Sequence, residues 1–294
     1  MLSYLHGYHA GNEADVLKHS TLVFCLDYLK QKEKPLLCVD THAGAGFYDL
    51  SNPSNQEWKR GIGKLRETAE NPPPMLAGYL KLPEEERYPG SSVIMAAKLS
   101  RGDRLVSYEL HPGEFEALKG SMEKFRGDNR PTVEVRREDG LGGLKSLLPP
   151  PSRRGLVFID PSWEEQSEYE SVPRSVSEGL KRFPEGTFII WYPLLALPKE
   201  KNATASQRDV LFSLSNGKRC RVELYDKAAE ACHSSEVLRS GETIHSRSPR
   251  GMYGSGLVIY NPPWTLFSAL EEALPGLALS LFNDEKGWRL DREE

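Results

Sequence analysis

The chain has 294 residues, a formal net charge of −4, 38% hydrophobic residues and 27% charged residues. These values are typical of a globular protein with an ordinary core, and they exclude a generic nucleic-acid coat protein, which is basic overall. The longest apolar runs are far shorter than the roughly 18 residues of a transmembrane helix, so we expect no membrane contact.

The N-terminal residues and the cysteines indicate the cellular compartment of the protein. A signal peptide has a basic region followed by an apolar one, and the sequence lacks that pattern, so we expect no leader. The cysteines show no CxxC spacing, and Cys25 and Cys38 lie in apolar runs, which favours reduced core residues. We therefore expect a cytoplasmic protein.

Residues 1–12 are rich in tyrosine and histidine, and they either dock on the core or form part of a site. Residues 13–31 carry apolar side chains every three to four positions, which predicts a helix. Lys18 and His19 lie beside that apolar stripe, and the pattern alone is compatible with ordinary surface positions. The histidines match no metal-ligand spacing, so we predict no metal.

The next segment combines a strand with a loop of small residues. An apolar run over residues 36–39 ends at Asp40, and Gly44 and Gly46 follow. A buried parallel strand brings its carboxyl end to a ligand in this way, and an acid there can accept hydrogen bonds from a cofactor. A tight strand-to-helix connection explains the same residues. The segment is no GxxxxGK[ST] phosphate loop, because no Lys-Ser/Thr follows.

The rest of the chain predicts a single α/β domain, 1–294. Residues 52–88 are punctuated by prolines and are interpreted as an inserted helical subdomain. Further strands are predicted at 104–109, 132–136, 155–160, 187–192, 221–225 and 256–260, and helices lie between most of them. This alternation predicts a seven-stranded, mostly parallel sheet covered on both faces, whose last strand suits an antiparallel neighbour. The charged tail from Asn283 is expected to be loose.

Two strand ends carry chemistry. Glu109 ends the second strand, where an acid can hold ribose hydroxyls. Asp160-Pro161-Ser162-Trp163 differs only at its third position from the Asp-Pro-Pro-aromatic tetrapeptide of amino-group methyltransferases. Its carboxylate and the Pro161 carbonyl can accept both hydrogens of an adenine amine, and Trp163 can stack on the extruded base. A strand-end turn is the alternative interpretation, and we adopt it for residues 261–264, which resemble the same tetrapeptide.

The chain resembles the RlmJ family of ribosomal large-subunit RNA adenine-N6 methyltransferases over essentially its whole length. The matching segments include residues 1–4, 9–12, 14–19, 40–46, 88–91, 109–112, 139–140, 152–156, 191–193 and 261–264. The departures from the family are Ser162 and Trp163, where it has Pro and Tyr.

This resemblance implies a Rossmann-like fold that binds S-adenosylmethionine, without a metal, and methylates N6 of one adenine in 23S ribosomal RNA. The implied cofactor contacts are His19, His42, Gly44, Ser91, Glu109, Asp139, Gly140 and Asp160. Glu109 is expected on the ribose and Asp139 on the adenine amine. Asp160, Pro161 and Trp163 are the expected catalytic residues, and Tyr4, His6 and Lys18 are expected to contact the RNA, with residues 1–12 as the substrate-contacting motif.

The expected partner is ribosomal RNA, free or early in assembly, and the expected state is a monomer. Two alternatives stay open on the sequence. One is an adenine-N6 methyltransferase that acts on DNA or on another RNA. The other is a non-catalytic relative that keeps the cofactor fold and has lost its chemistry through Ser162.

Overall fold

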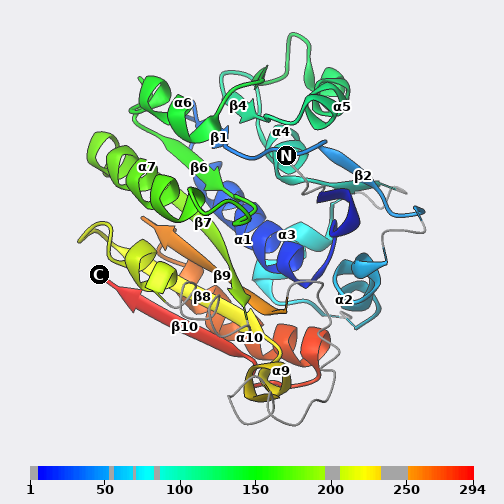
Figure 1. Cartoon of the computed structure of the whole chain (residues 1–294). Coiled ribbons are helices and arrows are strands. Elements are labelled where there is room, and N and C mark those ends of the chain that lie inside the picture. The colour runs from blue at the N-terminus through cyan, green and yellow to red at the C-terminus, as the bar shows by residue number, and fades with distance from the viewer. Residues whose placement is uncertain (1–5, 53–55, 69–70, 83–86, 196–205, 233–250) are drawn as a thin grey trace.

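The structure is a computed structural model, and it describes residues 6–52, 56–68, 71–82, 87–195, 206–232 and 251–294 (Figure 1). The helices are α1 (Glu13–Leu29), α2 (Ile62–Thr68), α3 (Pro74–Leu80), α4 (Ser91–Lys98), α5 (Pro112–Met122), α6 (Gly140–Leu147), α7 (Glu168–Arg182), α9 (Lys227–Cys232) and α10 (Leu266–Phe282), with 3-10 turns η1 (His6–Tyr8), η2 (Glu57–Lys59) and η3 (Glu123–Phe125). In the part of the chain described, no helix is long and apolar enough to cross a membrane.

The strands are β1 (Leu37–Asp40), β2 (Phe47–Asp49), β3 (Arg87–Pro89), β4 (Arg104–Tyr108), β5 (Thr132–Arg136), β6 (Gly155–Ile159), β7 (Thr187–Leu195), β8 (Arg219–Tyr225), β9 (Met252–Tyr260) and β10 (Trp288–Glu293). The main sheet has eight strands in the order β10-β8-β9-β7-β6-β1-β4-β5, and β2 and β3 form a separate two-stranded sheet. The five strands β5, β4, β1, β6 and β7 are parallel, and β9 is antiparallel to both its neighbours. The predicted Rossmann-like, mostly parallel sheet is confirmed, with eight strands instead of seven.

The eighth strand lies in the tail that we expected to be loose, and that prediction was wrong. β10 pairs antiparallel with β8, so that Asp291 lies opposite Arg221 and Arg289 lies opposite Glu223. Arg221 Nη2 is 2.7 Å from Asp291 Oδ2, and Arg289 Nη1 is 3.1 Å from Glu223 Oε2. The charges of the tail therefore pair with charges on the neighbouring strand, which favours the strand over a solvated tail.

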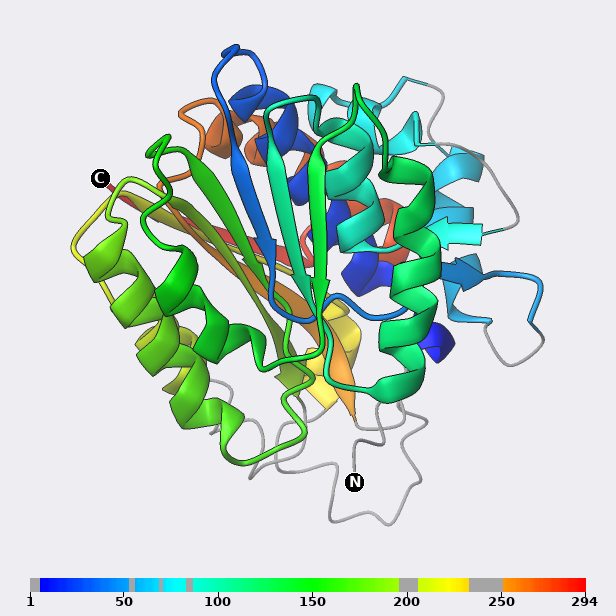
Figure 2. The same ribbon diagram turned by 90° about the horizontal axis from the view of Figure 1, so that it is seen from above.

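Helices cover both faces of the main sheet (Figure 2). α6 and α7 pack together on one face, and α1, α4, α5 and α10 lie on the other. Every residue of β1 and of β6 is buried. A strand that is covered on both faces reads as a continuous apolar run, which is why residues 36–39 and 155–159 gave clear strand predictions.

Helix α1 is buried along most of its length. Asn12 caps its N-terminus, because the Asn12 side chain accepts a hydrogen bond from the Asp15 N–H at 3.1 Å. α3, α4 and α10 all contact α1, so side chains on several of its faces are covered. Lys18 and His19 are 3% and 2% exposed, so neither occupies the ordinary surface position that the helical pattern alone left open.

Residues 56–89 contain η2, α2, α3 and β3. β3 pairs antiparallel with β2, in the loop that follows β1, and α2 and α3 contact both α1 and α10. The segment therefore packs beside the N-terminal helix and close to the loop that ends in Gly46.

Candidate active site

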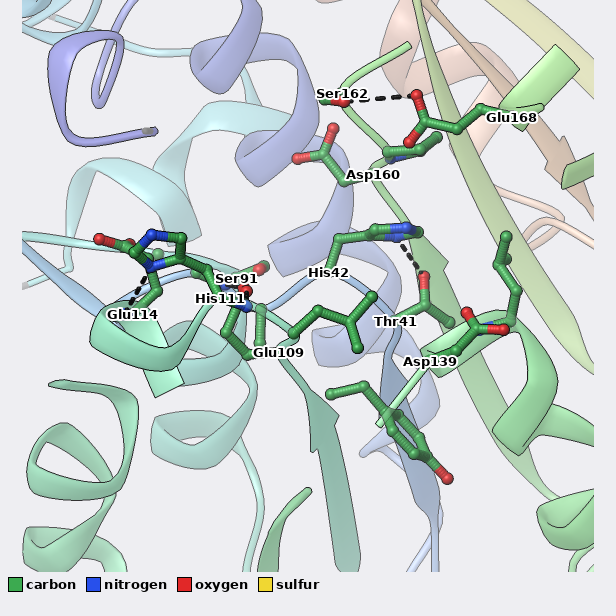
Figure 3. Close-up of a pocket in the computed structure, with 18 of the residues that line it drawn as sticks. Thr41, His42, Ser91, Glu109, His111, Glu114, Asp139, Asp160, Ser162 and Glu168 are labelled. Atoms are coloured by element: carbon green, nitrogen blue, oxygen red, sulfur yellow. Dashed lines mark hydrogen bonds between the residues drawn. The ribbon is translucent and has the colours of Figure 1, made fainter. Parts of the chain in front are cut away.

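A cavity of about 320 Å³ opens at the carboxyl ends of β1, β4 and β6. All residues predicted to bind a cofactor contribute to its wall: His19, His42, Gly44, Ser91, Glu109, Asp139, Gly140 and Asp160. Figure 3 shows Asp160, Ser162 and Glu168 at one end of the cavity and Glu109, His111 and Glu114 at the other. The position agrees with the general rule that open α/β sheets bind ligands outside the carboxyl ends of their strands.

The turn after β1 requires glycine at position 44. Gly44 has φ of +60°, and a Cβ atom there would lie 2.0 Å from the Tyr48 hydroxyl. Its N–H donates to Glu109 Oε2 at 2.9 Å, while Glu109 Oε1 accepts from the His111 N–H at 2.7 Å. Glu109 thus joins the glycine turn to the end of β4.

Asp139 caps helix α6. Its carboxylate accepts from the Leu141 N–H at 3.0 Å and from the Gly142 N–H at 3.1 Å. The next residue, Gly140, leaves no room for a side chain, because a Cβ atom would lie 2.3 Å from the Thr41 carbonyl oxygen. The start of α6 therefore lies directly against the loop that follows β1.

Asp40 does not line the cavity, contrary to the expectation that it accepts hydrogen bonds from a cofactor. It is 0% exposed, and its Oδ2 accepts from the Ser91 and Ser92 hydroxyls at 2.6 Å and 2.7 Å. Burial raises the pKa of Asp40 to about 6, although both hydroxyls act in the opposite direction. Asp40 therefore holds the first turn of α4 and places Ser91 in the wall.

His42 places a partly buried imidazole in the wall. Burial lowers its pKa to about 4, against the attraction of Asp160 and Asp139. Its Nδ1 lies 2.8 Å from the Thr41 hydroxyl oxygen. The ring is therefore neutral near pH 7 and adds no positive charge to the cavity.

His19 is held by tyrosines from the segment before α4. Its Nδ1 is 2.7 Å from the Tyr88 hydroxyl, and the two rings stack with their centroids 5.5 Å apart. Tyr88 in turn lies 2.9 Å from the Tyr79 hydroxyl. The sequence analysis missed both tyrosines as supports of the site, because only the folded contact of α3 and β3 with α1 brings them to His19.

Lys18 connects helix α1 to the predicted catalytic acid. Its Nζ is 2.8 Å from Asp160 Oδ2 and 2.9 Å from Asp15 Oδ1. The same ammonium lies 4.9 Å from the centroid of the Trp191 ring. Asp15 is fully buried, and it also accepts from the Gly11 N–H at 2.8 Å. A single buried cation therefore faces two carboxylates.

The tetrapeptide is divided between the cavity and the core. Asp160, Pro161 and Ser162 line the cavity. Trp163 is 5% exposed, its Nε1 donates to the Trp191 carbonyl at 3.0 Å, and its edge meets the Tyr169 ring. The indole thus packs into the core in this structure, where the sequence analysis expected a platform for the base.

The second copy of the motif behaves as the predicted turn. Asn261 has φ of +48°, and its Nδ2 donates to the Pro184 and Gly186 carbonyls at 2.7 Å each. Tyr260, just before it, pairs with Phe188 at the start of β7. This turn lies at the edge of the sheet opposite the cavity.

The predicted RNA-contacting residues are only partly described. Tyr4 lies outside the described residues, and His6 begins η1. Further along, His9 Nδ1 lies 2.9 Å from Glu57 Oε2, and Asn12 Nδ2 donates to the same oxygen at 3.0 Å. Glu57 of η2 thereby anchors the N-terminal motif beside α1.

In the part of the chain that the structure describes, no group of three or more His, Cys, Asp or Glu side chains is placed to hold a metal ion. Glu168 is a further wall residue that the sequence analysis missed, and burial raises its pKa.

Several known proteins are similar to this chain. A family model described as RsmJ, "Ribosomal RNA large subunit methyltransferase D, RlmJ", matches residues 33–209. "Ribosomal RNA large subunit methyltransferase J" of Haemophilus influenzae strain KW20 / Rd is 37% identical, over 99% of this chain and 98% of the relative. The Escherichia coli K12 protein of the same name is 35% identical, over 94% of this chain and 93% of its own length.

One solved structure is also similar over nearly the whole chain. It is the crystal structure of a Legionella pneumophila str. Philadelphia 1 protein, which is 32% identical with a TM-score of 0.78. The match covers 97% of this chain and 98% of the other.

Proposed function

This chain belongs to the RlmJ family of ribosomal RNA large subunit methyltransferases, and we propose that it transfers a methyl group from S-adenosylmethionine to N6 of an adenine in 23S ribosomal RNA. The observation that carries the proposal is the position of Asp160. Its carboxylate follows β6 directly, lines the cavity beside Pro161 and is held 2.8 Å from the buried Lys18 ammonium.

The cavity wall suits this cofactor. Glu109 and Asp139 already accept backbone N–H groups, but each carboxylate oxygen keeps a second lone pair for a ribose hydroxyl or an adenine amine. The tight turn at Gly44 lets a ligand approach the backbone. His42 is neutral near pH 7, so it does not repel a sulfonium. When bound, the cofactor supplies a methyl electrophile whose positive charge needs no metal.

Asp160 and Pro161 act on the target amine. The lone pair of an exocyclic adenine amine is delocalised into the ring, so the amine is a poor nucleophile. The Asp160 carboxylate and the Pro161 carbonyl accept its two hydrogens and turn the lone pair toward the methyl group. Once the amine nitrogen carries the methyl group, its surplus proton would pass to Asp160 and then to solvent.

Lys18 holds Asp160 in place for this step. Its ammonium lies 2.8 Å from Asp160 Oδ2 and so fixes the direction in which the carboxylate faces. We assign Trp163 to the support of the loop, because its indole is held by the Trp191 carbonyl. Contact with the RNA by Tyr4, His6 and Lys18 remains part of the proposal. So does ribosomal RNA, free or in early assembly, as the substrate of a monomer.

The experiment compares Asp160→Ala with the wild type in methyl transfer to large-subunit ribosomal RNA. Turnover should fall by about 10²-fold or more, while calorimetry shows that S-adenosylmethionine still binds. Lys18 keeps Asp15 as its partner at 2.9 Å, so the variant should fold. Asp27→Ala, which removes a half-exposed carboxylate from the same helix α1, is the matched control. Unaltered turnover in Asp160→Ala would exclude the assigned role.

The choice of nucleic acid needs a competition experiment. Duplex DNA and a ribosomal RNA hairpin are offered together to the wild-type enzyme, with labelled cofactor. We expect the label in the RNA. Label in the DNA would instead support a DNA adenine methyltransferase.

A further inference from the structure

The loop between β6 and α7, residues 160–168, forms one end of the cavity. Asp160, Pro161, Ser162, Glu165 and Glu168 of this loop all line the cavity wall. Under the proposed function, the target amine is held by the Asp160 carboxylate and by the Pro161 carbonyl. The position of both acceptors depends on how rigidly this loop is held, because small displacements of reacting groups are costly in rate.

Ser162 leaves the loop without the restraint that proline would give. A proline ring fixes φ near −65°, and serine has no such restriction. The same chain contains the proline form at residues 261–264, so the two forms can be compared within one molecule. At position 162 a different restraint has to hold the backbone.

Three contacts supply that restraint. The Ser162 hydroxyl donates to Glu168 Oε2 at 3.3 Å (Figure 3). The Glu165 N–H donates to the same oxygen at 3.2 Å. The Glu164 N–H donates to Ser162 Oγ at 3.3 Å. The hydroxyl contact is longer than the optimum for O–H···O, so the three contacts act together rather than singly. They close the loop onto the first residue of α7, whose N-terminal end favours a carboxylate.

The residue after Ser162 shows that the loop is under strain. Trp163 has φ of +56°, a left-handed conformation that side chains rarely adopt. Its indole is fixed on one side by the Trp191 carbonyl and on the other by the Tyr169 ring. A strained residue keeps its conformation only where its surroundings hold it, and Glu168 holds the residue just before it.

We propose that Glu168 is a positioning residue, which holds the Asp160–Trp163 loop through the Ser162 hydroxyl and thereby replaces the restraint of a proline at position 162. The proposal rests on the proposed function for its kinetic consequence. The role of Glu168 does not require that its carboxylate contacts the substrate.

The test is a set of four proteins: wild type, Glu168→Ala, Ser162→Pro and the double variant. Among the described residues, the Ser162 N–H donates no hydrogen bond, so proline removes none. We expect Glu168→Ala to lower kcat about tenfold, with KM for RNA and the cofactor Kd changed less than about twofold. In the Ser162→Pro background, the same substitution should change kcat less than about twofold.

Glu170→Ala is the matched control, because Glu170 is an exposed carboxylate in the same first turn of α7. An equal fall of kcat in both backgrounds would mean that Glu168 acts independently of Ser162, and an unchanged kcat in Glu168→Ala would mean that it positions nothing. Either result overturns the proposal. If Ser162→Pro does not fold, Ser162→Ala takes its place, and the effects of Ser162→Ala and Glu168→Ala must be non-additive.

A second measurement separates this proposal from the proposed function. Backbone hydrogen exchange of residues 160–168 needs no turnover. At Asp160 and Trp163 it should be faster in Glu168→Ala than in the wild type, and the same substitution should not change it in the proline background. The Glu165 N–H, which donates to Glu168 Oε2, loses its acceptor in both backgrounds. If the wild type shows no methyl transfer, the proposed function fails, and the exchange data alone still support or overturn the role of Glu168.

Discussion

Lys18→Met should destabilise the protein far more than the loss of a surface lysine. The substitution keeps the length of the side chain and removes its charge, which leaves Asp15 and Asp160 without the cation that both contact. At 2.8 Å and 2.9 Å, each attraction is worth about 6 kcal/mol at an effective dielectric constant of about 20. The cost of burying the ammonium offsets most of this, and breaking a buried pair from one side has a net cost of about 3–5 kcal/mol.

This free energy converts into a melting temperature. Unfolding entropy of about 2.1 cal/mol/K per residue gives about 0.6 kcal/mol/K for 294 residues. The Tm of Lys18→Met should therefore fall by about 5–8 °C at pH 7. Calorimetry measures the shift.

Lys98→Met is the matched control. Lys98 Nζ lies 2.7 Å from Asp27 Oδ1, but the two side chains are 23% and 47% exposed. Exposed pairs are worth about 1 kcal/mol or less, so the Tm should move by less than about 2 °C. Equal Tm shifts in the two variants would refute the reasoning.

Three further predictions concern other parts of the site. Burial raises the pKa of Asp40 from 3.8 to about 6, so its contribution to stability is present at low pH and is lost as pH rises through 6. Relative to the wild type, the free energy of unfolding of Asp40→Asn, measured in urea, should rise by on the order of 3 kcal/mol between pH 4 and pH 7. A difference between the two proteins that does not vary with pH would contradict this. Gly140→Ala places a Cβ atom 2.3 Å from the Thr41 carbonyl oxygen, so it should cost about 1–3 kcal/mol of stability and weaken S-adenosylmethionine binding. The control Gly120→Ala, whose Cβ atom meets nothing within 4 Å, should be tolerated. Similar cofactor Kd values in the two variants would exclude the steric argument. Glu57→Ala should raise KM for RNA several-fold with little change in the cofactor Kd, because it releases the N-terminal motif, and an unchanged KM would show that Glu57 does not position it.

Much of the fold could be predicted because buried parallel strands have a local signature. The apolar runs end at Asp40, Glu109 and Asp160 or at the residue before each acid. The carboxyl ends of parallel strands meet at one edge of a sheet. The residues of the predicted cofactor site were therefore brought together in one cavity wall.

The remaining features depend on partners far away in the sequence. The charged tail forms β10 because Arg221 and Glu223 lie opposite its charges, and nothing within the tail indicates them. Lys18 looked like a surface lysine because its partner Asp160 is 142 positions away. Trp163 lies in the core and has a left-handed backbone angle, which no spacing of residues predicts.

The central claim is tested most directly by the identity of the methylated nucleoside. The wild-type protein is incubated with labelled S-adenosylmethionine and protein-free large-subunit ribosomal RNA, and the RNA is digested to nucleosides. We predict that the label is recovered as N6-methyladenosine from a single site in 23S RNA. Label in another nucleoside, or no transfer while calorimetry shows that the cofactor is bound, would contradict the account.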